Sequence, residues 1–187
     1  MKNKTSKMVL RILTAVCFLW ILVNGAISFI SGRIYESGDI ITIVLALLPV
    51  IAGIVIIIGA LTDSHIVIGL GAVIYLIPMI YSVYTGIQQL QSFTTDEMKA
   101  HMRGLIISSG LIILAFLFLA LACFDKKRDL AFCVFSAALF VAWFFVRRSY
   151  LSADDSQLSI ILTAAGSVIG TILIGFSMVL RRRKKEE

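Results

Sequence analysis

The residues of this sequence best suited to hold a metal ion are Asp96, Glu97 and His101, which share one short polar stretch. In a helix, Glu97 and His101 lie one turn apart, so that a carboxylate and an imidazole would face the same ion. Two or three ligands make a weak site, however, and an amphipathic turn that faces solvent accounts for the same residues. We therefore expect no metal site here.

The cysteines are the other reactive side chains, and Cys17, Cys123 and Cys133 each lie within or at the edge of an apolar run. None has the Cys-x-x-Cys spacing of a zinc site, and their positions indicate packing rather than a disulfide framework. His65 and His101 lie in separate polar stretches. The sequence predicts no catalytic residue, no cofactor and no metal, and hence a protein that is not an enzyme.

Long apolar runs are the elements that would position any site. Apolar residues make up 59% of the chain and charged residues 15%, against about 45–50% and about 25% in ordinary soluble domains. Runs of about 20 apolar residues cross a bilayer as helices. Residues 1–187 are therefore predicted to form a single all-α, polytopic membrane domain in the lipid bilayer. Its six transmembrane helices are expected at 8–30, 40–62, 66–84, 104–124, 130–146 and 158–180.

The first and fifth of these ranges depart from an ordinary span. The apolar run at 12–32 follows several lysines, but it exceeds the core of a secretion signal, which is about 7–15 residues long, so we expect a retained helix. The fifth range holds only 17 residues between Asp129 and Arg147. Its length of about 26 Å falls short of a hydrocarbon core of ~30 Å and requires local thinning or snorkelling.

The basic residues indicate the orientation of the chain. Lys and Arg are enriched in the cytoplasmic segments of membrane proteins. With the N-terminus inside, 12 of the 17 Lys and Arg residues fall in inner segments. These are Lys2, Lys4, Lys7, Arg11, Lys126, Lys127, Arg128, Arg181, Arg182, Arg183, Lys184 and Lys185. We expect a protein of the plasma membrane with both termini in the cytoplasm, and the net charge of +6 then needs no nucleic-acid partner.

In this orientation the connections at 31–39, 85–103 and 147–157 lie outside and are longer than the two inner turns. Thr94 and Glu97 have the spacing of a capping box, which predicts a short interfacial helix leading into the fourth span. His65 and His101 then lie at opposite faces of the membrane and cannot share a site.

The spans contain few polar groups. Apart from Arg11 near the edge of the first, none holds Asp, Glu, Lys, Arg or His, so a proton or cation relay through internal ionisable groups is excluded. Asn24 either forms an interhelical hydrogen bond or lines a polar pathway. Pro49 and Pro78 indicate either simple kinks or the broken helices of a transporter.

The sixth span carries a helix-packing motif. Gly166 and Gly170 form a GxxxG arrangement, with Thr163 and Ser167 nearby, so that another backbone can approach this face closely. The partner is either another helix of the same chain or a second copy in a homo-oligomer. The basic tail at 181–185 is explained either as a stop-transfer anchor or as a site for anionic lipid.

The even-numbered spans resemble one another, each with small residues in its first half and bulky aliphatic residues later, and their centres recur at about 60 residues. This pattern predicts three helical-hairpin repeats. The chain thereby resembles the HdeD-like family of bacterial acid-resistance membrane proteins, most clearly at Ser37, Gly38, Asp39 and Ile40 and at the glycines that follow, Gly53 and Gly59.

The resemblance implies a non-enzymatic protein of the bacterial inner membrane that is associated with stress or acid tolerance, and it supplies no catalytic motif. The alternative function is a small transport component, such as a six-helix substrate-binding subunit of an uptake system. The sequence does not identify a small-molecule substrate for either function.

Overall fold

The computed structural model describes residues 2–31, 39–125, 127–150 and 157–186. Each of its six helices contains a segment of 22 to 29 residues that is apolar enough to cross a membrane. At about 1.5 Å per residue the shortest extends about 33 Å, which suffices for a hydrocarbon core of ~30 Å. The predicted all-α, six-span membrane fold is confirmed. The helices are α1 (Lys2–Ser31), α2 (Ile40–Thr62), α3 (His65–Ser92), α4 (Asp96–Phe124), α5 (Asp129–Tyr150) and α6 (Gln157–Glu186).

Several helices extend beyond the ranges expected from the sequence, most of all α3 and α4. α3 continues to Ser92 and α4 begins at Asp96, so the expected connection at 85–103 is nearly all helical. The glutamines after Gly86 are good helix formers, and no proline interrupts them. The expected short interfacial helix is therefore the beginning of α4 itself.

The ends of α4 and α5 correct two further expectations. The N-cap of α4 is Thr95 rather than Thr94, and Thr95 makes no side-chain capping hydrogen bond. The capping box predicted for Thr94 and Glu97 is therefore wrong. α5 has 22 residues rather than 17, because Arg147 and Arg148 lie in its last turn. Cations are favourable at this end of a helix, where the dipole is negative. The apolar part of α5 is still the 17 residues between Asp129 and Arg147, so local thinning or snorkelling stays a prediction.

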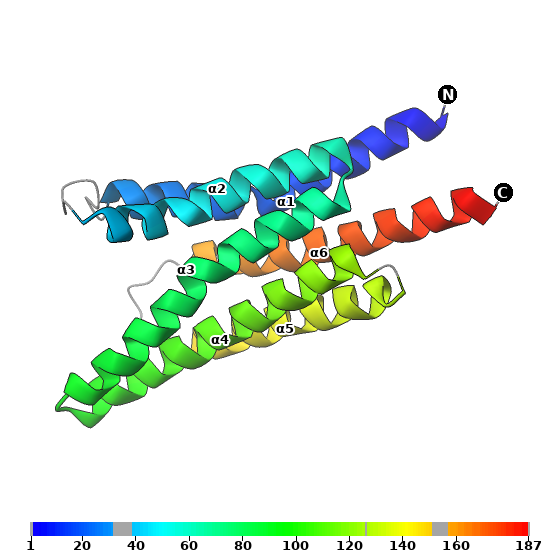
Figure 1. Cartoon of the computed structure of the whole chain (residues 1–187). Coiled ribbons are helices and arrows are strands. Elements are labelled where there is room, and N and C mark those ends of the chain that lie inside the picture. Colours follow the sequence, from blue (N-terminus) through cyan, green and yellow to red (C-terminus); the bar gives the residue numbers. More distant parts are fainter. Residues whose placement is uncertain (1, 32–38, 126, 151–156, 187) are drawn as a thin grey trace.

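The helices are arranged as a ring in chain order. Each helix packs against the next, and α6 packs back against α1 and closes the ring. Both termini lie at the same end of the bundle as the α2–α3 and α4–α5 turns (Figure 1). We call this end the termini face.

Aromatic side chains fill the middle of the bundle. Trp20 of α1 meets Tyr75 of α3 edge-on at 6.3 Å between ring centroids, and Tyr75 lies 4.5 Å from Phe116 of α4. Phe116 in turn packs edge-on against Phe140 of α5 at 5.4 Å. Phe116 and Phe140 are almost completely buried. This aromatic row links four of the six helices and occupies the space between them, which a central pore would require.

The two ends of α2 have specific caps. The Asp39 carboxylate accepts hydrogen bonds from the backbone N–H groups of Ile41 and Thr42 and so caps the start of the helix. At the other end, Asp63 adopts a left-handed conformation with φ 58°, and Ser64 donates its N–H to the Gly59 carbonyl at 2.8 Å. Asp tolerates this conformation better than most residues, and the resulting Schellman turn reverses the chain into α3.

Candidate functional site

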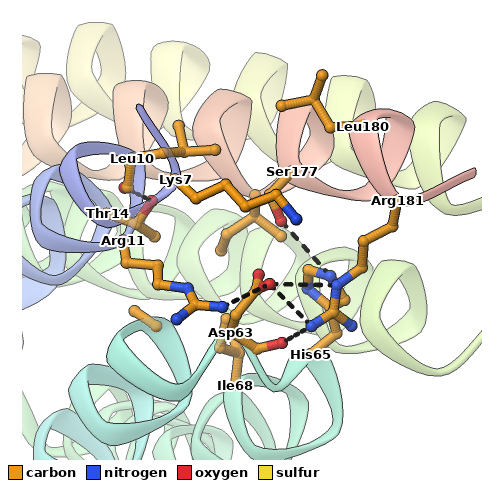
Figure 2. A pocket seen from close by; sticks show the side chains of 12 residues that line it. Lys7, Leu10, Arg11, Thr14, Asp63, His65, Ile68, Ser177, Leu180 and Arg181 are labelled. Carbon is orange, nitrogen blue, oxygen red and sulfur yellow. Dashed lines mark hydrogen bonds and ion pairs between the residues drawn. The ribbon is translucent and has the colours of Figure 1, made fainter. Parts of the chain in front are cut away.

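Three charged residues meet at the termini face. The Asp63 carboxylate lies 3.2 Å from the Arg11 guanidinium of α1 and 3.0 Å from the Arg181 guanidinium of α6. Arg181 also donates a hydrogen bond to the Asp63 backbone carbonyl, as Figure 2 shows. We call Arg11, Asp63 and Arg181 the clasp, because together they connect the α2–α3 turn to the first and the last helix.

The tight turn after α2 explains how Asp63 can reach both arginines. Its left-handed backbone lets the chain reverse within two residues, so the carboxylate stays between the ends of α1 and α6. The Asp63 side chain is 17% exposed, whereas those of Arg11 and Arg181 are 39% and 46% exposed. The acid is therefore the more buried member, and the two cations lie between it and the surroundings.

The clasp keeps Asp63 ionised. Partial burial raises the pKa of this carboxyl, but hydrogen bonds and positive charge from Arg181 and Arg11 outweigh burial, and the net pKa lies below its ordinary value of 3.8. A carboxylate that accepts charge-assisted hydrogen bonds from two guanidinium groups binds both more strongly than a neutral acceptor would. Its negative charge is thus the feature on which the clasp depends.

A second polar pair lies beside the clasp. His65 Nε2, at the start of α3, lies 3.4 Å from the Ser177 hydroxyl of α6. Within the described ranges, His65 Nδ1 and Arg11 Nε are buried and have no hydrogen-bond partner. Both residues line a small cavity of about 30 Å³ together with Asp63 and Arg181 (Figure 2). A cavity of this size is large enough for a water molecule.

A larger cavity of about 400 Å³ opens on the other side of His65, between the α2–α3 turn, the end of α4 and the start of α5. Its lining includes Asp63, His65, Asp129 and Arg181, and Asp129 is only 6% exposed. We call it the termini-face cavity. It brings together two carboxylates, an imidazole and a guanidinium, which are groups able to bind a small polar molecule.

The residues that the sequence suggested for metal chemistry lie elsewhere. Asp96, Glu97 and His101 are exposed at the start of α4, at the opposite end of the bundle from His65. Across the described ranges, no group of three His, Cys, Asp or Glu side chains could hold a metal ion. Cys123 and Cys133 are buried and Cys17 is half-buried, and all three are free thiols.

The small residues of α6 lie against α1. A Cβ atom added at Gly166 would come within 2.7 Å of the Cys17 carbonyl oxygen, and one at Gly170 within 2.6 Å of the Phe18 ring. Thr163 and Ser167 are buried, and the Ser167 hydroxyl donates to the Thr163 carbonyl within α6 at 2.7 Å. The close approach seen here is therefore between two helices of one chain.

The other polar positions singled out in the spans have simple surroundings. Asn24 is half-buried on α1, and no interhelical hydrogen bond of its side chain occurs in the part of the chain that the structure describes. α2 and α3 continue through Pro49 and Pro78 without a break. Gly25 of α1 leaves room for Pro49, since an added Cβ would lie 3.1 Å from the proline Cβ.

Reasoning from the sequence missed the clasp and one interhelical hydrogen bond. Asp63 is the single acidic residue between Asp39 and Asp96, and it lies in a very short turn predicted to face the same side as Arg11 and Arg181. This isolated acid among basic segments was the sequence signal that could have indicated the clasp. No comparable signal marked Ser136 of α5, whose buried hydroxyl donates to the Ala115 carbonyl of α4 at 2.8 Å.

These features define an integral, multi-pass α-helical membrane protein with a polar site at one end. Comparison with protein-family models, with curated proteins and with solved structures finds no match to this chain. Of the residues that carry the HdeD-like resemblance, Ser37 and Gly38 lie outside the described residues and Asp39 caps α2. An added Cβ at Gly53 would meet the Leu22 backbone at 2.7 Å, and one at Gly59 the Ile68 backbone at 2.7 Å, so these glycines allow α2 to pack closely on α1 and α3.

Proposed function

We propose that this chain is a non-enzymatic protein of the bacterial plasma membrane, of the HdeD-like kind, which contributes to stress or acid tolerance with both termini in the cytoplasm. The observation that carries the proposal is the aromatic row from Trp20 to Phe140, which fills the middle of the bundle where a transport pathway would pass. The described parts of the spans hold no Asp, Glu, Lys, Arg or His at the level of this row. Such an interior favours a packed bundle over a relay.

A protein that supports cells in acid must keep its own fold when the pH falls. Carboxylates buried within a membrane would gain protons and lose their partners, whereas apolar and aromatic packing does not titrate. The clasp fits the same requirement, because the low pKa of Asp63 preserves its charge in more acidic conditions than an ordinary carboxyl tolerates. The clasp is therefore expected to remain intact when the pH falls moderately.

The proposal is tested first in cells. Deletion of the gene should reduce survival after an acid challenge, and expression of the wild-type chain should restore it. Asp63→Asn should restore survival less well than the matched exposed change Asp96→Asn. Equal survival with and without the gene would contradict a role in acid tolerance.

A second test uses purified protein in liposomes that contain a pH-sensitive dye. We expect no gradient-driven proton flux above that of empty vesicles, because the described spans contain no internal relay of ionisable groups. Flux that survives both Asp96→Asn and Glu97→Gln would show a pathway through the bundle and would contradict the packed-bundle function.

The alternative function, a small transport component such as the substrate-binding subunit of an uptake system, is favoured by the termini-face cavity. Its volume of about 400 Å³ and its lining by Asp129, His65 and Arg181 suit a small molecule with both donor and acceptor groups. Thermal stability measured against a panel of amino acids, amines and vitamins tests this function. Stabilisation by one compound that disappears in Asp129→Asn would favour it, and no stabilisation by any would favour the non-enzymatic bundle.

A further inference from the structure

We propose that a groove between α1 and α6 at the termini face binds an anionic phospholipid of the adjoining leaflet. The groove has a volume of about 330 Å³ and lies where the last helix closes the ring against the first. Its lining comes from both helices: Ser6, Lys7, Val9, Leu10, Leu13, Phe176 and Leu180.

The walls of the groove suit an acyl chain. Val9 and Leu13 of α1 are 50% and 48% exposed, and Phe176 of α6 is 55% exposed. Large apolar side chains exposed to this extent face hydrocarbon in a membrane protein, so the groove is open to lipid rather than to the bundle interior. An acyl chain in it would contact both helices at once.

The mouth of the groove suits a phosphate group. Ser6 and Lys7 lie at its polar end, and Arg181 directly follows the lining residue Leu180. Lys7, Arg11 and Arg181 lie at this seam, and the Asp63 carboxylate is shared by the two arginines. The sequence places nine Lys and Arg residues at 2–11 and 181–185, against the three acids Asp63, Glu186 and Glu187, so the net charge of these segments is positive. The excess of positive charge favours a headgroup with net negative charge over a zwitterionic one, and basic pockets between helices on the cytoplasmic side bind such lipids.

The length of α1 along the groove matches the distance from the phosphate of a phospholipid to the start of its acyl chain. From Ser6 to Leu13 the helix rises about 10 Å, so one lipid molecule can place its phosphate at the polar end while its first methylene groups lie against Leu13. Lys2 and Lys4 lie in the same end of α1, and residues 182–185 of α6 are all basic.

The groove also adjoins the clasp. Lys7, Leu10 and Leu180 line both the groove and the small cavity that holds Arg11, Asp63 and Arg181. A lipid bound between α1 and α6 would therefore cover the seam that the clasp closes. Because a ligand that binds the folded state stabilises it, the lipid should raise the stability of the whole chain.

The experiment measures lipid binding to the full-length protein in neutral detergent, by native mass spectrometry and by thermal unfolding. Phosphatidylglycerol should bind and raise the unfolding temperature, whereas phosphatidylcholine and inorganic phosphate should do neither at the same concentration. Lys7→Gln should weaken binding of phosphatidylglycerol about fivefold, the factor expected for one basic residue near an anionic surface. Lys127→Gln, an exposed change on the same face but outside the groove, should leave binding unchanged.

A second variant tests the apolar part of the site without altering charge. Val9→Trp should fill the groove and weaken phosphatidylglycerol binding, whereas Ile27→Trp, on the lipid-exposed surface near the other end of α1, should not. Equal binding of phosphatidylcholine and phosphatidylglycerol would overturn the proposal. So would equal weakening by Lys7→Gln and Lys127→Gln, because general attraction to the basic face would then explain the binding.

Discussion

The Asp63 carboxylate lies 3.0 Å from the Arg181 guanidinium, although 118 residues separate the two in the chain. Arg11 approaches the same carboxylate oxygen at 3.2 Å. Since these arginines belong to the first and the last helix, one acid in the α2–α3 turn connects the two ends of the ring. The clasp therefore forms only when α1, the α2–α3 turn and α6 have come together.

The first prediction concerns the energy of this contact. Asp63→Asn and Arg181→Gln should each lower the free energy of unfolding by about 1–2 kcal/mol, between the about 0.2–1 kcal/mol of exposed ion pairs and the about 1.5–3 kcal/mol of hydrogen bonds to charged groups. Asn is chosen because it tolerates the left-handed backbone at this position. Unfolding in mixed micelles measures both changes and their combination.

In the double variant the loss should be smaller than the sum of the two single losses, because both changes remove the same contact. Arg148→Gln, an exposed change in the last turn of α5, is the matched control and should alter stability by no more than about 0.5 kcal/mol. Strictly additive losses would show that Asp63 and Arg181 do not act as a pair.

The second prediction gives the pH dependence of the clasp. Because the pKa of Asp63 is lower in the folded protein than its ordinary value of 3.8, the contribution is complete above that value and is lost as the pH falls through the folded pKa. The stability difference between wild type and Asp63→Asn should therefore be constant from neutral pH down to about pH 5 and should shrink only below about pH 4. A difference that already disappears near pH 6 would assign the clasp energy to another titrating group.

The third prediction concerns the contact between α1 and α6. Gly166→Ala should destabilise the protein by about 1–3 kcal/mol, because the new Cβ would lie 2.7 Å from the Cys17 carbonyl oxygen and the two helices must separate. Gly110→Ala is the matched control within α4, where an added Cβ meets nothing within 4 Å. This control should be neutral or stabilising by up to about 1 kcal/mol. Equal stability of the two variants would contradict the close approach.

The fourth prediction separates two serines of α5. Ser136→Ala should lower the free energy of unfolding by about 0.5–1.5 kcal/mol, because its buried hydroxyl donates across to the Ala115 carbonyl of α4. Ser149→Ala removes a hydroxyl that donates to Phe145 within the same helix at an exposed position, and it should have little effect. The ratio of the two losses, measured in the same micelles, is the informative quantity, and a ratio near one would count against the interhelical bond.

The spans could be predicted from the sequence because each is a local run of apolar residues that must satisfy its own backbone hydrogen bonds in lipid. α2 shows this most simply, since its bounds of Ile40 and Thr62 agree with the expected range. The ends of α3 and α4 were harder, because polar residues such as Gln88 and Gln91 are good helix formers outside the hydrocarbon, where hydropathy no longer marks a helix.

The clasp could not be predicted in the same way. Contact between Arg11 and Arg181 on one carboxylate depends on which helices become neighbours when the ring closes, and the apolar runs do not encode that order. The termini-face cavity likewise needs the α2–α3 turn, the α4–α5 connection and α6 to converge on His65 and Asp129. The three-hairpin repeat stays a prediction, because similar composition alone gives apolar helices a similar pattern.

The last prediction concerns the orientation of the chain in the membrane. Both termini share one face with the α2–α3 and α4–α5 turns (Figure 1), and the excess of Lys and Arg on that face favours a cytoplasmic location for it.

The experiment places single cysteines on a background in which Cys17, Cys123 and Cys133 are alanine. Thr95→Cys, in the link between α3 and α4, and Lys127→Cys, in the α4–α5 turn, are both exposed and lie at opposite ends of α4. An impermeant thiol reagent applied to intact cells should label Thr95→Cys and leave Lys127→Cys unlabelled, whereas both should react after the membrane is permeabilised. The permeabilised sample controls for thiol reactivity, so a label on Lys127→Cys alone in intact cells would reverse the orientation and would place the clasp and the lipid groove at the outer leaflet.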